Sequence, residues 1–130
     1  MPNYKIEIAD TVESAVQDSD VICTVTASKE PLFSHNNLKP GCHINAVGAS
    51  KHLFVSLSLK SLLGTPVARE LSSDTMVNAL VFTDRKESLV NEAGDFVIPL
   101  NEGKFDESHL KGELSDLVLK KVEGKRKVNE

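Results

Sequence analysis

The sequence lacks a glycine-rich turn for binding phosphate. Its seven glycines lie at positions 41, 48, 64, 94, 103, 112 and 124, and no two of them are two residues apart. The G-x-G-x-x-G turn, which seats a pyrophosphate on a helix N-terminus, is therefore absent. The chain also has no P-loop, no H-E-x-x-H helix and no G-x-S-x-G turn. None of the common short signatures for nucleotide, zinc or serine-nucleophile chemistry is present.

Potential metal ligands and disulfide partners are also scarce. The four histidines, at positions 35, 43, 52 and 109, have no metal-binding spacing, so we predict no metal site. We interpret Cys23 and Cys42, which lie in apolar runs without a C-x-x-C pair, as buried free thiols in a reducing compartment. His43 lies in a predicted buried strand. We interpret it as a hydrogen-bonded core residue rather than a catalyst.

Long hydrophobic runs are missing as well. No stretch reaches the roughly 18 residues of a membrane span, and the first ten residues have no signal-peptide core. The net charge is −4, and the one basic cluster, at 125–127, lies in a short tail that also contains acids. We therefore expect one cytoplasmic domain without nucleic-acid or membrane partners.

Short apolar runs alternate with helical patterns along the chain. Strands are expected at 4–8, 20–26, 42–48 and 78–84, the second of them covered on both faces because its apolar run is continuous. Helices are expected at 12–19, capped by Asp10 or Thr11, at 85–94, closed by Gly94, and at 109–124. The last would have an apolar stripe of Leu110, Leu114, Leu117 and Val118. This alternation predicts an α/β fold with a mostly parallel sheet.

Small and hydroxylated residues end two of these strands. They are Thr24, Val25 and Thr26 after the first buried run, and Val47, Gly48, Ala49 and Ser50 after the second. In parallel sheets ligands bind beyond the carboxyl ends of the strands, so both groups are expected on one binding edge. Small residues would allow a flat ligand to approach the backbone. From the pattern alone, two ordinary strand ends remain an equal alternative.

Residues 51–64, KHLFVSLSLKSLLG, differ from their neighbours. Leucine, serine and lysine dominate, acids are absent, and the alternation of Leu53, Val55, Leu57 and Leu59 with other residues suits a half-buried strand. Taken alone, the segment is a strand or a loose apolar loop.

Four segments in one order resemble the ornithine cyclodeaminase/mu-crystallin family. They are ADTVESAVQDSDVICTVTASKEPLF, LKPGCHINAVGAS, ARELSSDTM and NEAGDF. The likeness covers about residues 5–50 and 65–119, and it implies a Rossmann-type α/β parallel sheet with NADP(H) or NAD(H) as cofactor. It places residues 1–130 on the second half of the nucleotide-binding domain, so that the domain is incomplete. The substrate and dimerisation domain would be absent, although the family forms homodimers. Residues 51–64 are then a probable insertion, either a gene-model artefact or a genuine loop.

The resemblance also implies roles for particular residues. Thr24, Val25 and Thr26, together with Val47, Gly48 and Ala49, match the strand ends beside the nicotinamide half of the cofactor. Ser50 falls where the cyclodeaminases have a catalytic aspartate, and Glu92 matches an acidic residue near the ligand pocket; both are predicted to contact substrate. A serine cannot act as the general base that a carboxylate provides. This departure favours the reductase branch of the family over ornithine cyclodeamination.

Three functions remain open from the sequence. The first is an oxidoreductase acting on CH–NH groups, which would reduce the C=N bond of a cyclic ketimine carboxylate with NAD(P)H. The second is a non-catalytic binding protein for a small amino-acid-like ligand such as thyroid hormone. The third is an inactive truncated product, because the phosphate-binding half of the domain is not in this chain. We expect the isolated chain to be inactive and poorly soluble.

Overall fold

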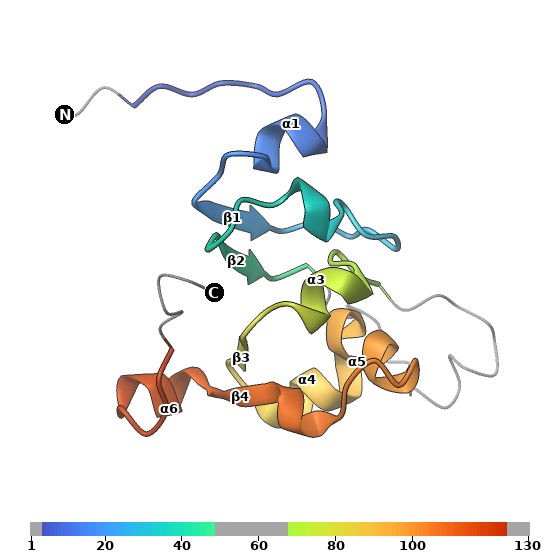
Figure 1. The fold of residues 1–130 in the computed structure, drawn as a ribbon, viewed down its shortest axis with the longest axis vertical. Coiled ribbons are helices and arrows are strands. Elements are labelled where there is room, and N and C mark those ends of the chain that lie inside the picture. Colours follow the sequence, from blue (N-terminus) through green and yellow to red (C-terminus); the bar gives the residue numbers. More distant parts are fainter. Residues whose placement is uncertain (1–3, 49–67, 125–130) are drawn as a thin grey trace.

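The computed structural model describes residues 4–48 and 68–124. Its elements in chain order are α1 (Val12–Val16), β1 (Val21–Thr24), η1 (His35–Asn37), β2 (His43–Ala46), α3 (Ser73–Val77), β3 (Val81–Thr83), α4 (Lys86–Glu92), α5 (Gly94–Asn101), η2 (Glu107–His109), β4 (Leu110–Glu113) and α6 (Leu114–Val118). In Figure 1, α1, β1 and β2 lie in the upper part of the molecule, and β3, β4, α4, α5 and α6 lie in the lower part. None of the helices in the two described ranges is long and apolar enough to cross a membrane.

Two parallel strand pairs form the β structure of the described ranges. β1 pairs with β2, with Val21 opposite His43 and Thr24 opposite Ala46. β3 pairs with β4, with an irregularity after Val81. The parallel pairing confirms the predicted α/β fold, because parallel neighbours require crossover connections rather than hairpins.

The helix before β1 begins as predicted. Of the two candidate caps, Thr11 is the one used: its hydroxyl accepts a hydrogen bond from the Ser14 backbone N–H at 3.1 Å. The Ser14 hydroxyl lies 3.4 Å from the Thr11 backbone N–H, which completes a capping box. Val16 is the residue that this short helix buries. It joins Ile22 of β1 in the core.

The prediction that β1 is covered on both faces is wrong for the described residues. Ile22 and Thr24 are buried, whereas Val21 and Cys23 are exposed, so only alternate side chains face the core. The interpretation of both cysteines as buried is also wrong, because Cys23 is exposed and Cys42 is only partly buried. His43 is also exposed rather than in the core, and its Nε2 lies 3.0 Å from Asn45 Oδ1.

Two further expectations are corrected. Residues 4–8 form no strand, and Tyr4, Ile6 and Ile8 are exposed; among the described residues no neighbouring strand pairs with this segment. The helix expected over 109–124 is instead β4 followed by the short α6. Pairing with β3 satisfies the backbone of β4, and Gly112 within it is a poor helix former. Val118 of the expected apolar stripe is exposed.

The predicted helix 85–94 corresponds to α4, but Gly94 does not end it as expected. It begins a second helix, α5, which contains Pro99 and was not predicted. Phe96 of α5 is fully buried, and its ring packs against Phe105 in a tilted arrangement, with the ring centroids 5.1 Å apart and an interplanar angle of 43°. Leu71, Met76 and Val81 belong to the same core cluster.

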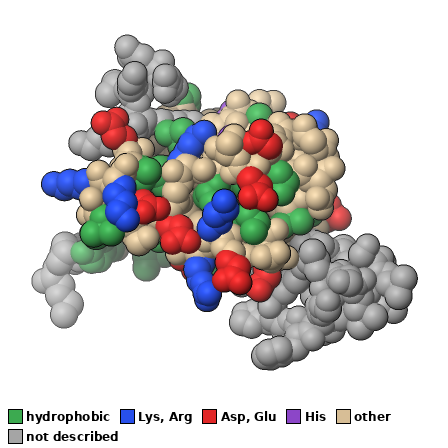
Figure 2. Space-filling view, turned by 90° about the horizontal axis from the view of Figure 1, so that it is seen from below, with side chains coloured by type: hydrophobic (Ala, Val, Ile, Leu, Met, Phe, Trp, Pro, Cys, Tyr) green, Lys and Arg blue, Asp and Glu red, His purple; other side chains and the backbone are tan. Residues whose placement is uncertain are grey.

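The underside of the molecule is highly charged. Figure 2 shows acidic and basic side chains intermixed on this face, with hydrophobic side chains between them. Exposed ion pairs include Arg85–Glu87 at 3.1 Å and Lys86–Glu107 at 3.5 Å. Such exposed pairs contribute little to stability.

Candidate binding edge at the carboxyl ends of β1 and β2

The structure brings the two predicted strand ends together. The Val47 backbone N–H donates to the Thr24 carbonyl at 2.9 Å, which extends the β1–β2 pairing beyond the strands. Val25 and Val47 expose 71% and 58% of their surface, so an apolar face is available at this edge. Thr24 is buried beneath it. Ala49 and Ser50 lie outside the described residues.

A buried glutamate joins the two strand ends. Glu70 is 0% exposed. Its Oε1 accepts from the Thr26 backbone N–H at 2.5 Å, and its Oε2 accepts from the Gly48 backbone N–H at 2.8 Å. Both carboxylate oxygens are thus used to bind backbone amides from two different strand ends.

Gly48 is required at this junction by lack of space. A Cβ atom there would overlap the carbonyl oxygen and nitrogen of Thr26 and Oε1 of Glu70. The constraint is steric. It does not depend on the conformational freedom of glycine, since its φ lies outside the left-handed region. Close approach of two backbones and a carboxylate therefore accounts for the glycine in HINAVG.

A second buried carboxylate positions Glu70. Oδ1 of Asp95, in the first turn of α5, accepts from the backbone N–H groups of Glu70 and Leu71 at 2.7 and 2.9 Å. Its other oxygen, Oδ2, is buried and has no hydrogen-bond partner among the described residues. Asp95 therefore fixes the backbone of the residue whose side chain fixes the binding edge.

The two carboxylates have opposite electrostatic environments. Burial alone would raise the pKa of Glu70, but the side chains of Thr26 and Thr24 and the backbone N–H groups of Thr26 and Gly48 outweigh burial and hold that pKa below its ordinary value. Burial raises the pKa of Asp95, and the nearby charge of Glu70 adds to this effect, despite the hydrogen bonds from Leu71 and Glu70. The geometry thus favours an ionised Glu70 next to a more weakly acidic Asp95.

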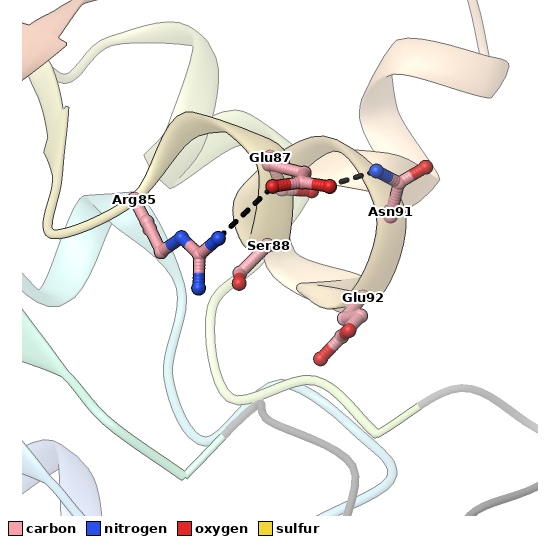
Figure 3. A pocket seen from close by; sticks show the side chains of 5 residues that line it. All are labelled: Arg85, Glu87, Ser88, Asn91 and Glu92. Carbon is pink, nitrogen blue, oxygen red and sulfur yellow. Dashed lines mark hydrogen bonds and ion pairs between the residues drawn. The ribbon is translucent and has the colours of Figure 1, made fainter.

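Glu92, the predicted substrate contact, lies elsewhere. It is exposed near the end of α4 and lines a shallow pocket of about 350 Å³ with Arg85, Glu87, Ser88 and Asn91. Figure 3 shows that these side chains all come from α4 and the residue before it. Arg85 pairs with Glu87, and Asn91 Nδ2 donates to the Glu87 carbonyl at 2.7 Å. No residue of the β1–β2 edge lines this pocket.

Sequence reasoning missed Glu70 and Asp95, although both lie in segments that carry the resemblance. Their partners are 22 to 44 residues away in the sequence, so no local pattern marks them. The sequence feature that could have indicated them is an acidic residue among mostly apolar and small neighbours. In the described residues, no group of three or more His, Cys, Asp or Glu is arranged to hold a metal ion.

Parallel strand pairs joined by crossover connections define the class, a Rossmann-type α/β protein. The profile of the ornithine cyclodeaminase/mu-crystallin family matches residues 2–130, and the chain belongs to this family.

Individual members of the family are also similar to this chain. The chain is 35% identical over 116 residues to Delta(1)-pyrroline-2-carboxylate reductase of Colwellia psychrerythraea, covering 89% of this chain and 32% of that protein. It is 36% identical over 93 residues to ketimine reductase mu-crystallin of Rattus norvegicus, covering 72% of this chain and 25% of the relative. Among solved structures, Thermococcus litoralis Delta(1)-pyrroline-2-carboxylate reductase in complex with NADH and L-proline aligns with a TM-score of 0.76 and 30% identity, covering 92% of this chain and 32% of that chain. The chain spans a quarter to a third of the length of these relatives.

Proposed function

We propose that the described residues form the nicotinamide-side wall of an NAD(P)(H) site in an imine reductase. The observation that carries the proposal is the joined pair of strand ends, in which Thr24–Thr26 and Val47–Gly48 lie together at the carboxyl edge of a parallel pair. A relative of similar fold was solved with NADH and L-proline. This resemblance favours the expected cofactors, NADH or NADPH.

The residues at the edge fit one half of such a cofactor. Exposed Val25 and Val47 offer an apolar surface. A flat aromatic ring could rest on this surface. The glycine-rich turn for the pyrophosphate is not in this sequence. The edge therefore supplies one wall of the site, and the phosphate contacts have to come from other residues.

The proposed substrate is a cyclic ketimine carboxylate such as Delta(1)-pyrroline-2-carboxylate. When bound, a reduced nicotinamide would supply hydride to the imine carbon and a proton would be added to the nitrogen, which would give a cyclic amino acid and the oxidised cofactor. The contribution of this chain is orientation: a fixed wall limits where the ring can lie relative to the substrate. Ser50 and Glu92 remain proposed substrate contacts.

Oxidation of NADH and NADPH, followed by the loss of nicotinamide absorbance, tests the proposal. The longest naturally expressed form of the protein is mixed with Delta(1)-pyrroline-2-carboxylate, and reactions without the imine are the control. We expect imine-dependent oxidation of one or both cofactors. No oxidation in a form that binds NADH would contradict the reductase assignment.

The same preparation separates the alternatives. Tight binding of thyroid hormone without imine reduction would favour a binding protein. Binding of neither cofactor nor hormone by the 130-residue chain alone would agree with a truncated product that is inactive in isolation. A homodimer and a cytoplasmic location stay predictions from the family resemblance and the composition.

A further inference from the structure

The segment that carries Glu70 is held on several sides. Its backbone N–H donates to Asp95 Oδ1 at 2.7 Å, and its carbonyl accepts from the Leu32 backbone N–H at 2.8 Å. The preceding Arg69 N–H donates to the Ser28 carbonyl at 3.2 Å. The following Leu71 forms a parallel bridge with Phe33. The backbone that carries this carboxylate is therefore fixed in position.

No side-chain cation neutralises Glu70 in the described residues. The nearest basic residue in the sequence, Arg69, donates instead to the Leu71 carbonyl at 2.9 and 3.1 Å and to the Ser73 hydroxyl at 3.2 Å. Glu70 forms none of the ion pairs found in the described ranges. Its partners are the backbone amides of Thr26 and Gly48. A carboxylate used in this way acts as a two-pronged acceptor for backbone rather than as half of an ion pair.

We propose that Glu70 is a positioning residue, whose carboxylate ties the ends of β1 and β2 into one rigid wall against which the nicotinamide ring is held. This inference rests on the proposed function. It adds a residue that does not itself touch the cofactor but fixes two segments that do. The amides of Thr26 and Gly48 are consumed by Glu70, so the wall presents Val25 and Val47 rather than free donors.

Glu70→Gln is the most direct test, because it keeps the shape of the side chain. A glutamine has one acceptor oxygen, and its NH₂ group would face the second backbone N–H donor to donor. One of the two amides therefore loses its acceptor. Glu102→Gln is the matched control, because exposed Glu102 accepts a single hydrogen bond, from the Ser73 hydroxyl at 2.8 Å, and lies away from the edge in the C-cap of α5.

The experiment uses the longest naturally expressed form of the protein and two measurements. The first is residue-resolved amide hydrogen exchange without cofactor. In Glu70→Gln, exchange at Thr26 or Gly48 should rise about tenfold, the ratio expected for loss of a charge-assisted hydrogen bond, and it should not change in Glu102→Gln. The second is the dissociation constant for NADH, at a temperature where circular dichroism shows both variants to be folded. It should rise about tenfold in Glu70→Gln only.

The outcomes are distinguishable. We call the pair of hydrogen bonds from the Thr26 and Gly48 amides to Glu70 the clamp. Unchanged exchange at both amides in Glu70→Gln would show that the clamp does not exist, which overturns the proposal. Faster exchange with an unchanged NADH dissociation constant would show that the clamp has only a structural role, which overturns the positioning assignment and leaves the proposed function intact. If the unmodified protein binds no NADH, the proposed function fails and the positioning role falls with it, while the exchange data still report whether the clamp exists.

Measurements on the unmodified protein keep the proposal testable if Glu70→Gln does not fold. The Thr26 and Gly48 amide protons should both resonate downfield and exchange slowly, because both donate to a carboxylate. Rapid exchange at either amide would overturn the clamp without any variant. Addition of NADH should then slow exchange further at Val25 and Val47, and the absence of any change there would overturn the assignment of this wall to the cofactor.

Discussion

The two described parts of the chain differ in how many of their large apolar side chains are buried. Residues 68–124 enclose a core around Phe96, and large apolar side chains such as Leu71, Met76 and Val81 are buried with it. Residues 4–48 contribute Val16, Ile22 and Phe33 to the same core cluster. They expose seven large apolar side chains, against five in residues 68–124; the seven are Tyr4, Ile6, Ile8, Val12, Val21, Val25 and Val47. The core is therefore shared by the two parts, with its largest fully buried side chain, Phe96, in the C-terminal part, whereas the candidate binding edge belongs to the N-terminal part.

The contrast shows why buried polar contacts matter at the junction. The N-terminal part contributes Val16, Ile22 and Phe33 to the shared core, but its strand ends are held by hydrogen bonds from their backbone to Glu70 of the C-terminal part. The C-terminal part in turn supplies Asp95, which fixes Glu70. We expect mutations to have effects that fall in size from the core, through the junction, to the exposed N-terminal segment.

Phe96→Ala should have the largest effect on stability. The ring is 0% exposed and lies in the core that both parts share. Truncation of a buried phenylalanine costs about 3–5 kcal/mol, because transfer free energy is lost and a cavity remains. Urea unfolding followed by circular dichroism measures the change. Val118→Ala, at a side chain that is 81% exposed, is the control and should change stability by less than about 0.5 kcal/mol. Equal effects of the two variants would contradict the burial of Phe96.

Gly48→Ala should have the next largest effect. The added methyl group overlaps Thr26 and Glu70, so the strand ends must separate, at a cost of about 1–3 kcal/mol. Amide exchange at Thr26 should rise at the same time. Gly41→Ala is the control: no atom lies within 4 Å of its added Cβ, but its φ of +81° costs about 1–2 kcal/mol in backbone strain. That control should leave the Thr26 amide protected. Loss of protection in both variants would argue against a local clash.

Asp95→Asn should change how stability depends on pH. Because burial raises the pKa of Asp95 in the folded state, this group stabilises the fold fully below its unfolded pKa, about 3.9, and this contribution is lost as pH rises through the folded pKa. Asparagine keeps one acceptor oxygen but does not titrate. The difference in unfolding free energy between wild type and variant should therefore narrow from acidic to neutral pH.

The contribution of Asp106 to stability changes with pH in the opposite direction, so Asp106 serves as the control for Asp95. The Ser108 side chain and backbone N–H donate to its carboxylate and lower the pKa of Asp106, so its contribution is present above the unfolded pKa and is lost as pH falls. The gap between wild type and Asp106→Asn should widen with rising pH. Urea unfolding at a series of pH values measures both variants, and gaps that change in the same direction would contradict the assigned environments.

Ile8→Ser should have the smallest effect. The side chain is 96% exposed, so its replacement should change the unfolding free energy by less than about 0.5 kcal/mol. The apolar alternation of residues 4–8 nevertheless predicts that solubility rises with the serine, because less apolar surface is open to association. A loss of more than about 1 kcal/mol in urea unfolding would mean that the segment is buried in solution.

Local patterns predicted the elements that local interactions determine. The cap at Thr11, the parallel strands β1 and β2 and their meeting at one edge followed from short-range signals. Residues 4–8 carry the same alternation as a strand, but a strand needs a partner, and a partner is not a property of the segment itself. Leu110–Glu113 carry a helical spacing, yet pairing with β3 outweighs it.

The candidate site was predicted in outline only. Small residues at the strand ends indicated the edge, and the resemblance gave its role. The two carboxylates that fix it could not be predicted, because a buried glutamate without a cation has no local signature and Pro99 and Gly94 obscured the helix that carries Asp95. Glu92 was predicted from resemblance, and the structure places it on the exposed surface of α4.

The hydrogen bond between Gly48 and Glu70 has a consequence for tolerance to changes in length. The Gly48 amide lies 2.8 Å from a carboxylate oxygen of Glu70, so positions 48 and 70 lie next to each other in space. For a closed loop, the entropic cost of additional residues grows only logarithmically, by roughly 0.6 kcal/mol for each doubling in length. Insertions and deletions between these two positions therefore cost the fold little, and the predicted insertion at 51–64 falls within this stretch.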